Sequence, residues 1–273
     1  MRKIYLIYAL LAFFGVQALA QGGDNGKNDN TVSKNLKKVS IVEGASKQAA
    51  DSAYRKDDFE TAAQMYESLL AMEGESPVYY YNLGNCYYKQ DNIPLAIICY
   101  ERAFLLDPGD ADIRANLALA RGKTVDKVTP PSEMFFITWA KTVVNLMSID
   151  RWAVLAITSF VLMLVLFLTY LFTNTIWIRK TGFYGAVAML FLCIIANLAA
   201  YSQHQTLNKR DYAIVIAPSI VVRSSPNESS TELFVIHEGS KVHIEDESMK
   251  GWREIKLEEG KVGWVPVDAI EVI

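Results

Sequence analysis

Two long uncharged runs constrain the fold of this chain more than any other feature. Residues 152–178 and 181–208 contain no Asp, Glu, Lys or Arg, and only Arg179 and Lys180 separate them. A helix of about 20 apolar residues crosses the hydrocarbon layer of a bilayer. The composition, 51% hydrophobic and 21% charged, agrees with membrane segments joined to soluble domains. The expected transmembrane helices are 152–174 and 181–203.

The N-terminus has the pattern of a secretory signal peptide over residues 1–20. Two basic residues precede an apolar run, and Ala18-Leu19-Ala20 provides an A-x-A cleavage site. The alternative is an anchor that stays in the membrane. Residues 21–42, rich in Gly, Asn, Asp and Lys, are expected to form a disordered leader. Export of the following segment places the Arg179-Lys180 loop in the cytoplasm, as the positive-inside bias prefers.

A helical repeat occupies residues 43–121. Small, aromatic and apolar residues recur after Pro77 at the spacing of a tetratricopeptide repeat (TPR), and a degraded copy lies 34 residues earlier. The matching residues are Tyr80, Leu83, Gly84, Tyr87, Ala96, Tyr100, Ala103 and Pro108. The resemblance to TPR proteins implies two helical hairpins, 43–76 and 77–110, followed by a capping helix.

The same resemblance implies a binding surface on the inner face of the first helix of each pair. The residues at those positions are Lys47, Asp51, Tyr54, Arg55, Tyr81, Asn85, Tyr88 and Lys89. Amides and aromatic rings suit an extended peptide, although the same residues would also suit a solvated helix face. Because Asp51 stands where carboxylate-binding repeats have Asn, a C-terminal carboxylate ligand is not expected. Glu101 is expected to be exposed on the surface.

No arrangement of residues predicts an enzyme. The chain contains no phosphate-binding loop, no nucleophile elbow and no Cys/His pair, and its three histidines lack companion metal ligands. We therefore expect no catalytic residue, metal or cofactor. The net charge of −3 excludes the strong basic field of a nucleic-acid-binding protein. Cys86 and Cys99 are open to disulfide formation in an oxidising compartment, but buried thiols are the favoured interpretation, and Cys193 is expected to be inert.

A linker and a short amphipathic helix precede the first apolar run. Residues 122–133 include Pro130-Pro131 and mark a domain boundary. Residues 134–150 place apolar side chains on one helical face, which predicts an interfacial helix at the membrane surface or a helix packed against the spans. The residues of this face are Phe136, Trp139, Val143 and Met147.

Short Val- and Ile-rich runs alternate with turn signals over residues 212–273, a pattern typical of a small all-β domain. The segments around Val221-Val222-Arg223, Gly251-Trp252 and Gly263-Trp264-Val265 resemble a bacterial SH3-like domain. The resemblance implies a small β-barrel that binds cell-wall peptides or proteins, with Arg223, Trp252 and Trp264 as its ligand face. The alternative is that the tryptophans fill the core, and at least one is expected there.

The order of these modules resembles the BatE-like TPR proteins of the Bacteroides aerotolerance (Bat) operons. The expected fold is multidomain, with α-helical TPR hairpins, two transmembrane helices and an all-β barrel. The resemblance implies a scaffold tethered in the inner membrane, with both folded modules in the periplasm. The implied partners are envelope proteins with von Willebrand factor A (VWA) domains and, indirectly, a MoxR-type ATPase. The alternative is a peptidoglycan-binding anchor or sensor.

Overall fold

The computed structural model describes residues 42, 44–126 and 134–273. The expected signal peptide, nearly all of the expected leader and part of the expected linker lie outside these ranges. The described residues fall into two compact units. One unit comprises Ile157–Cys193, and the other comprises the described residues up to Ala156 together with Ile194–Ile273.

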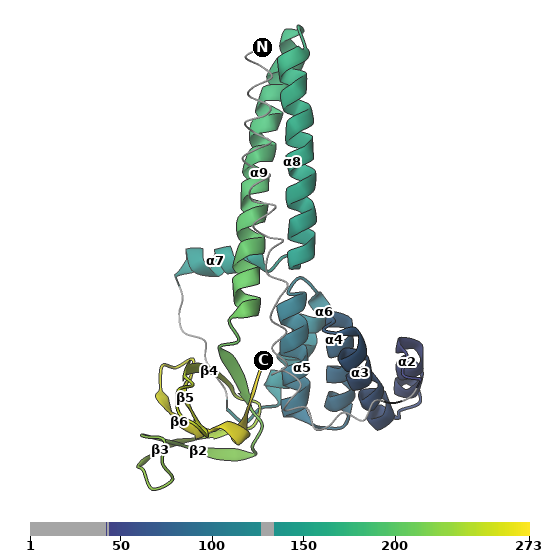
Figure 1. Ribbon diagram of the computed structural model, residues 1–273. Helices are drawn as coiled ribbons and strands as arrows, with labels where there is room; N and C mark the ends of the chain where they lie inside the picture. The colour runs from purple at the N-terminus through teal and green to yellow at the C-terminus, as the bar shows by residue number, and fades with distance from the viewer. Residues whose placement is uncertain (1–41, 43, 127–133) are drawn as a thin grey trace. The chain divides into compact units, whose positions relative to one another are not determined.

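Five helices succeed one another in the region of the predicted repeats (Figure 1). They are α2 Lys47–Arg55, α3 Phe59–Glu73, α4 Pro77–Lys89, α5 Ile93–Leu106 and α6 Ala111–Gly122. The turns inside the two hairpins have matching geometry, because Asp57 and Asp91 both adopt a positive φ, of 61° and 58°. The next residues, Asp58 and Asn92, cap the following helices with their side chains. The 34-residue period is thus visible in the backbone as well as in the sequence.

Small residues allow the paired helices to pack closely. A Cβ atom on Gly84 of α4 would lie only 2.7 Å from the ring of Tyr100 on α5. Cys86 and Cys99 are buried on the same two helices as free thiols. Burial raises the pKa of each to about 12, so both stay protonated and pack as small apolar side chains.

Residues from Tyr212 onward form one antiparallel sheet, which we call the C-terminal sheet. Its strands are β1 Tyr212–Val215, β2 Ser219–Arg223, β3 Glu232–His237, β4 Lys241–Asp246, β5 Trp252–Lys256, β6 Val262–Pro266 and β7 Ile270–Val272. The sheet is open, and its order runs from β3 at one edge to β7 at the other as β3-β2-β6-β5-β4-β1-β7. A single 3-10 turn, Val267–Ala269, connects β6 to β7.

Neither tryptophan of this sheet lies in the core, where we expected at least one of them. Ile255 and Val265 are fully buried, and strand residues alternate between the two faces. Trp252 and Trp264 are therefore on the face opposite the core, and both are half-buried. The expectation that at least one fills the core is wrong, because Val, Ile and Ala side chains fill it instead.

The C-terminal sheet packs directly against α5. Ile214 of β1 and Ile273 share an apolar cluster with Ile97 of α5. Arg102 of α5 donates hydrogen bonds to the Glu271 carboxylate and, over 2.8 Å, to the Val272 carbonyl oxygen.

Glu101 is the charged centre of this contact. Its expected surface position is wrong, because the sheet covers it and leaves its side chain 2% exposed. Its carboxylate pairs with Lys241 of β4 at 2.9 Å and with Arg121 of α6. Burial alone would raise the pKa of Glu101, but the two cations outweigh it and hold the pKa below the usual value.

The remaining helices are α7 Phe135–Val144, α8 Ile149–Phe172 and α9 Ile176–Asn208. Both α8 and α9 are long and apolar enough to span a membrane. Arg179 and Lys180 were expected in a loop, but they lie in the first turns of α9. Both are good helix formers, and the Arg179 N–H already donates to the Thr175 carbonyl oxygen, so the connection shrinks to residues 173–175.

Candidate functional site

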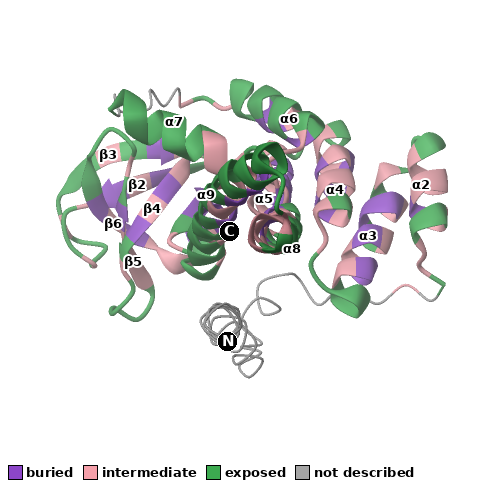
Figure 2. Ribbon diagram, turned by 90° about the horizontal axis from the view of Figure 1, so that it is seen from above, coloured by how far each residue is buried: buried purple, intermediate pink, exposed green. Residues whose placement is uncertain are grey.

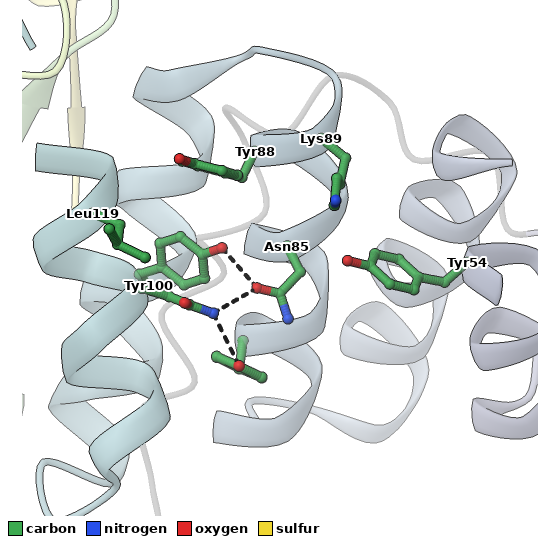
Figure 3. Close-up of a pocket in the computed structure, with 8 residues that line it drawn as sticks. Tyr54, Asn85, Tyr88, Lys89, Tyr100 and Leu119 are labelled. Atoms are coloured by element: carbon green, nitrogen blue, oxygen red, sulfur yellow. Dashed lines mark hydrogen bonds between the residues drawn. The ribbon is translucent and has the colours of Figure 1, made fainter. Parts of the chain in front are cut away.

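A cavity of about 280 Å³ opens on the faces of the repeat helices, and we call it the helical groove (Figure 3). Its lining comes from α2, α4, α5 and α6 and consists of four tyrosines, two asparagines, one lysine and one leucine. These residues are Tyr54, Tyr81, Asn85, Tyr88, Lys89, Tyr100, Asn116 and Leu119. No carboxylate is among them, so the lining favours hydrogen-bond acceptors and apolar groups over cations.

A hydrogen-bond network fixes the floor of the helical groove. The Tyr100 hydroxyl donates to Asn85 Oδ1 over 2.7 Å, and Asn116 Nδ2 donates to the same oxygen over 3.0 Å. Asn116 Nδ2 also donates to the Tyr81 hydroxyl oxygen over 2.9 Å. The Asn85 oxygen is therefore occupied within the protein, which directs the amide N–H groups of Asn85 and the O–H of Tyr81 to a ligand.

Two tyrosines form the walls. Tyr54 of α2 is braced by Phe59, with ring centroids 5.2 Å apart in an edge-to-face arrangement. Tyr88 of α4 has the Lys123 ammonium over its ring at 4.4 Å. Burial raises the pKa of Tyr54, and likewise that of Tyr100, so both hydroxyls remain protonated at neutral pH.

The structure brings together five of the eight residues that the repeat pattern proposed for binding. Those that line the helical groove are Tyr54, Tyr81, Asn85, Tyr88 and Lys89.

The other three, Lys47, Asp51 and Arg55, do not line it. Asp51 pairs with Lys47 at 3.1 Å and accepts a hydrogen bond from the Tyr66 hydroxyl. That hydrogen bond is the main reason why the pKa of Asp51 is lowered. Asp51 thus joins α2 to α3, and nothing in this arrangement directs it to a ligand.

The repeat pattern did not predict three of the lining residues. Tyr100 matches the repeat pattern and is buried between the helices, but its hydroxyl also reaches the floor of the groove. Asn116 and Leu119 lie on α6, which we expected only to cap the repeats. Leu119 follows Asn85 by one 34-residue period, so continuing the repeat into α6 would have identified this face.

A second candidate surface lies on the C-terminal sheet. Arg223 of β2 pairs in register with Trp264 of β6, which pairs in turn with Glu254 of β5. Trp252 is on the same outer face, and Arg223 is held by the Ser230 carbonyl oxygen at 2.9 Å. The register thus brings the three predicted residues of the SH3-like ligand face onto neighbouring strands.

The close contact at Gly84 makes the helical groove sensitive to a single methyl group. We expect Gly84→Ala to destabilise the protein by about 1–3 kcal/mol, because the added carbon displaces Tyr100 and with it the hydrogen bond to Asn85. Chemical unfolding of the full chain in detergent measures this effect. The control is Gly122→Ala at the end of α6, where the new Cβ meets no atom within 4 Å and the change is expected to be neutral or slightly stabilising. Equal stability of the two variants would contradict the packing argument.

Comparisons with known proteins identify one part of the chain. Within the described ranges, no group of three or more His, Cys, Asp or Glu side chains is placed to hold a metal ion. A search of curated proteins finds no match. The tetratricopeptide-repeat family model matches residues 77–110, the segment that holds α4 and α5. The chain therefore contains a tetratricopeptide repeat, which indicates a role in protein–protein interaction.

Proposed function

We propose that this protein is a membrane-tethered scaffold of the cell envelope that binds an extended segment of a partner protein in the helical groove. The single observation that carries the proposal is the lining of this groove, which combines tyrosine walls with amide and hydroxyl donors on a fixed floor. Peptide carbonyl oxygens pair with such donors, and the rings cover apolar side chains. The tetratricopeptide repeat supports the same role, which is non-enzymatic.

Site-specific photo-crosslinking tests this function. A benzophenone side chain at Tyr88 of the full chain is expected to form a covalent adduct with the partner in membranes. The same group at Met72, which is 49% exposed on α3 and outside the groove lining, is expected to give none. Adducts at Met72 but not at Tyr88 would show that the partner docks elsewhere.

The tether consists of α8 and α9, which cross the inner membrane as a hairpin. Export by an N-terminal signal peptide then places the repeats and the C-terminal sheet together in the periplasm. The sheet acts in this setting as a second, SH3-like interaction module.

The topology has a direct test in intact cells. Asn174→Cys, in the connection between α8 and α9, is expected to react with a membrane-impermeant thiol reagent only after lysis. Ser225→Cys, exposed after β2, is expected to react before it. The three native cysteines are buried and give a low background. Labelling of Ser225→Cys only after lysis would exclude the periplasmic placement.

We further propose an aerotolerance or stress-tolerance complex as the setting, with VWA-domain Bat proteins as direct neighbours and a MoxR-type ATPase reached through them. The support is the order of modules along the chain, which resembles the BatE-like proteins. Purified VWA-domain neighbours are expected to bind the detergent-solubilised full chain and to lose affinity when the helical groove is altered. If groove variants bind with unchanged affinity, the helical groove does not contribute to this complex.

The second candidate function is a peptidoglycan anchor or sensor, and one observation favours it. Trp252, Trp264 and Arg223 share the outer face of the C-terminal sheet instead of its core. The full chain is then expected to be retained on purified sacculi, and Trp252→Ala with Trp264→Ala is expected to abolish retention. Retention that survives both substitutions would argue against this face.

A further inference from the structure

Helix α7 carries an uncovered aromatic face. In the described helix Phe135–Val144 no residue is buried (Figure 2). Phe135, Phe136 and Trp139 are 85%, 53% and 70% exposed. At helical spacing these three rings lie on one side. Thr138 and Lys141 lie on the other side, where they line a cavity of about 610 Å³ against the C-terminal sheet. The polar side of α7 thus faces protein, while its aromatic side has no partner among the described residues.

Two side chains fix the end of α7 to the helices that follow. The last carbonyl groups of a helix lack partners within it. Gln203 Nε2 of α9 donates to the carbonyl oxygens of Val144 and Met147, both over 2.7 Å. Trp152 Nε1 of α8 donates to the Val144 oxygen over 2.9 Å. Gln203 is only 7% exposed, and a buried amide in apolar surroundings is costly unless it is hydrogen-bonded, so these contacts hold α7 firmly.

The fixed end of α7 lies where apolar surface begins on α8 and α9. Only four residues, 145–148, separate α7 from the start of α8. Val154 of α8 and Leu198 of α9, close to the contact with α7, are 60% and 63% exposed. Figure 1 shows α7 crosswise to the later part of α9. The end of α7 therefore meets the apolar surface that lipid covers when these helices span a membrane.

We propose that α7 is embedded in the headgroup layer of the bilayer, with Phe135, Phe136 and Trp139 as its lipid contacts and with Trp152 and Gln203 holding it there. Aromatic side chains suit this layer because their rings tolerate both water and hydrocarbon. Arg151 is paired with Asp107 at 3.1 Å, and Lys141 lines the cavity against the C-terminal sheet, so neither cation selects an anionic surface. A zwitterionic surface is sufficient. This inference rests on the membrane crossing in the proposed function.

Fluorescence quenching in phosphatidylcholine nanodiscs tests the inference on the full chain. An environment-sensitive label is attached at Phe136→Cys, with Thr138→Cys on the opposite side of α7 as the matched control and Ile157→Cys on α8 as the reference for membrane crossing. We expect the label at position 136 to be quenched by lipids spin-labelled near the headgroup. Its quenching constant with iodide should be several-fold lower than that at position 138.

The outcomes separate the two proposals. Lipid quenching at position 157 without quenching at 136 overturns the placement of α7 alone, whereas no quenching at 157 overturns the membrane crossing itself. A label at 136 that is shielded from iodide and also from spin-labelled lipid is covered by protein, for example a second copy. That result would overturn the proposal that lipid covers this face of α7.

The role of Gln203 has a separate readout. Gln203→Leu keeps α9 apolar but removes the hydrogen bonds to the Val144 and Met147 carbonyl oxygens, so iodide quenching at position 136 is expected to rise several-fold while lipid quenching at 157 stays unchanged. Gln205→Leu, two residues further along α9 and exposed, is the control and should change neither. Identical quenching in both variants would mean that Gln203 does not hold α7.

Discussion

Replacing Lys241 by methionine is expected to lower the free energy of unfolding by about 3 kcal/mol, the lower end of the range for breaking a buried ion pair. The substitution leaves the buried Glu101 carboxylate with Arg121 as its remaining partner, and it removes the ammonium group that lies 4.7 Å from the centre of the Tyr212 ring. Chemical unfolding of the full chain in detergent, followed by near-ultraviolet circular dichroism, measures the effect. Lys261→Met is the matched control, because its exposed pair with Glu259 is expected to contribute less than about 1 kcal/mol.

The effect of Lys241→Met on the free energy of unfolding should depend on pH. The pKa of Glu101 in the folded protein lies below its ordinary value of 4.5, so the stability that this ionised group contributes is complete above pH 4.5 and is lost as the pH falls through the folded-state pKa. The difference in stability between the wild type and Lys241→Met should therefore be largest at neutral pH and should shrink on acidification, as Glu101 is protonated in both proteins. A difference that is constant with pH would show that the lost contribution is packing alone.

Combining Tyr54→Ala with Tyr88→Ala is expected to weaken partner binding by roughly thirtyfold, which corresponds to about 2 kcal/mol. Both rings form walls of the helical groove, and truncating a central aromatic anchor removes most of its contact area. Titration calorimetry with the purified protein that crosslinks at Tyr88 measures the affinity. Tyr79→Ala, on the same helix as Tyr88 but outside the groove lining, controls for the loss of a tyrosine. Equal affinities for the double variant and the control would exclude the groove as the docking surface.

This binding experiment requires the full chain instead of the isolated repeats. Ile97 of α5 packs against Ile214 and Ile273, and Arg102 hydrogen-bonds to the last residues of the sheet. A fragment that ends at residue 121 would expose this apolar face and leave Glu101 without Lys241. A loss of binding by such a fragment would report unfolding and not the groove.

Features determined by nearby residues could be predicted from the sequence. Gly84 and Tyr100 are encoded within one repeat, and so are the turn at Asp91 and the cap at Asn92. The inner-face positions of α4 follow from the same period, which is why four of the groove residues on this helix were predicted. The helical hairpins therefore needed no information from elsewhere in the chain.

Features that depend on distant contacts could not be predicted. Glu101 is a charged residue in a helix, and its burial depends on the approach of the C-terminal sheet, which brings Lys241 from 140 residues later. The outer position of Trp252 and Trp264 depends on which strand face meets the core, and a shift of one residue would reverse it. Arg179 and Lys180 are compatible with either a loop or the first turns of a helix, and the local hydrogen bonds decide between them.

The packing of the last strand on α5 determines when this molecule can finish folding. Arg102 is separated from its partners at Glu271 and Val272 by 169 and 170 residues, so the contact forms only after residues 271 and 272 have been synthesised. Contacts between such distant residues form late, and the apolar face of α5 stays uncovered until then. A chain truncated before Ile270 keeps every repeat helix but lacks β7 and Ile273. It would thus present an exposed apolar helix, the feature by which chaperones and proteases distinguish incomplete proteins.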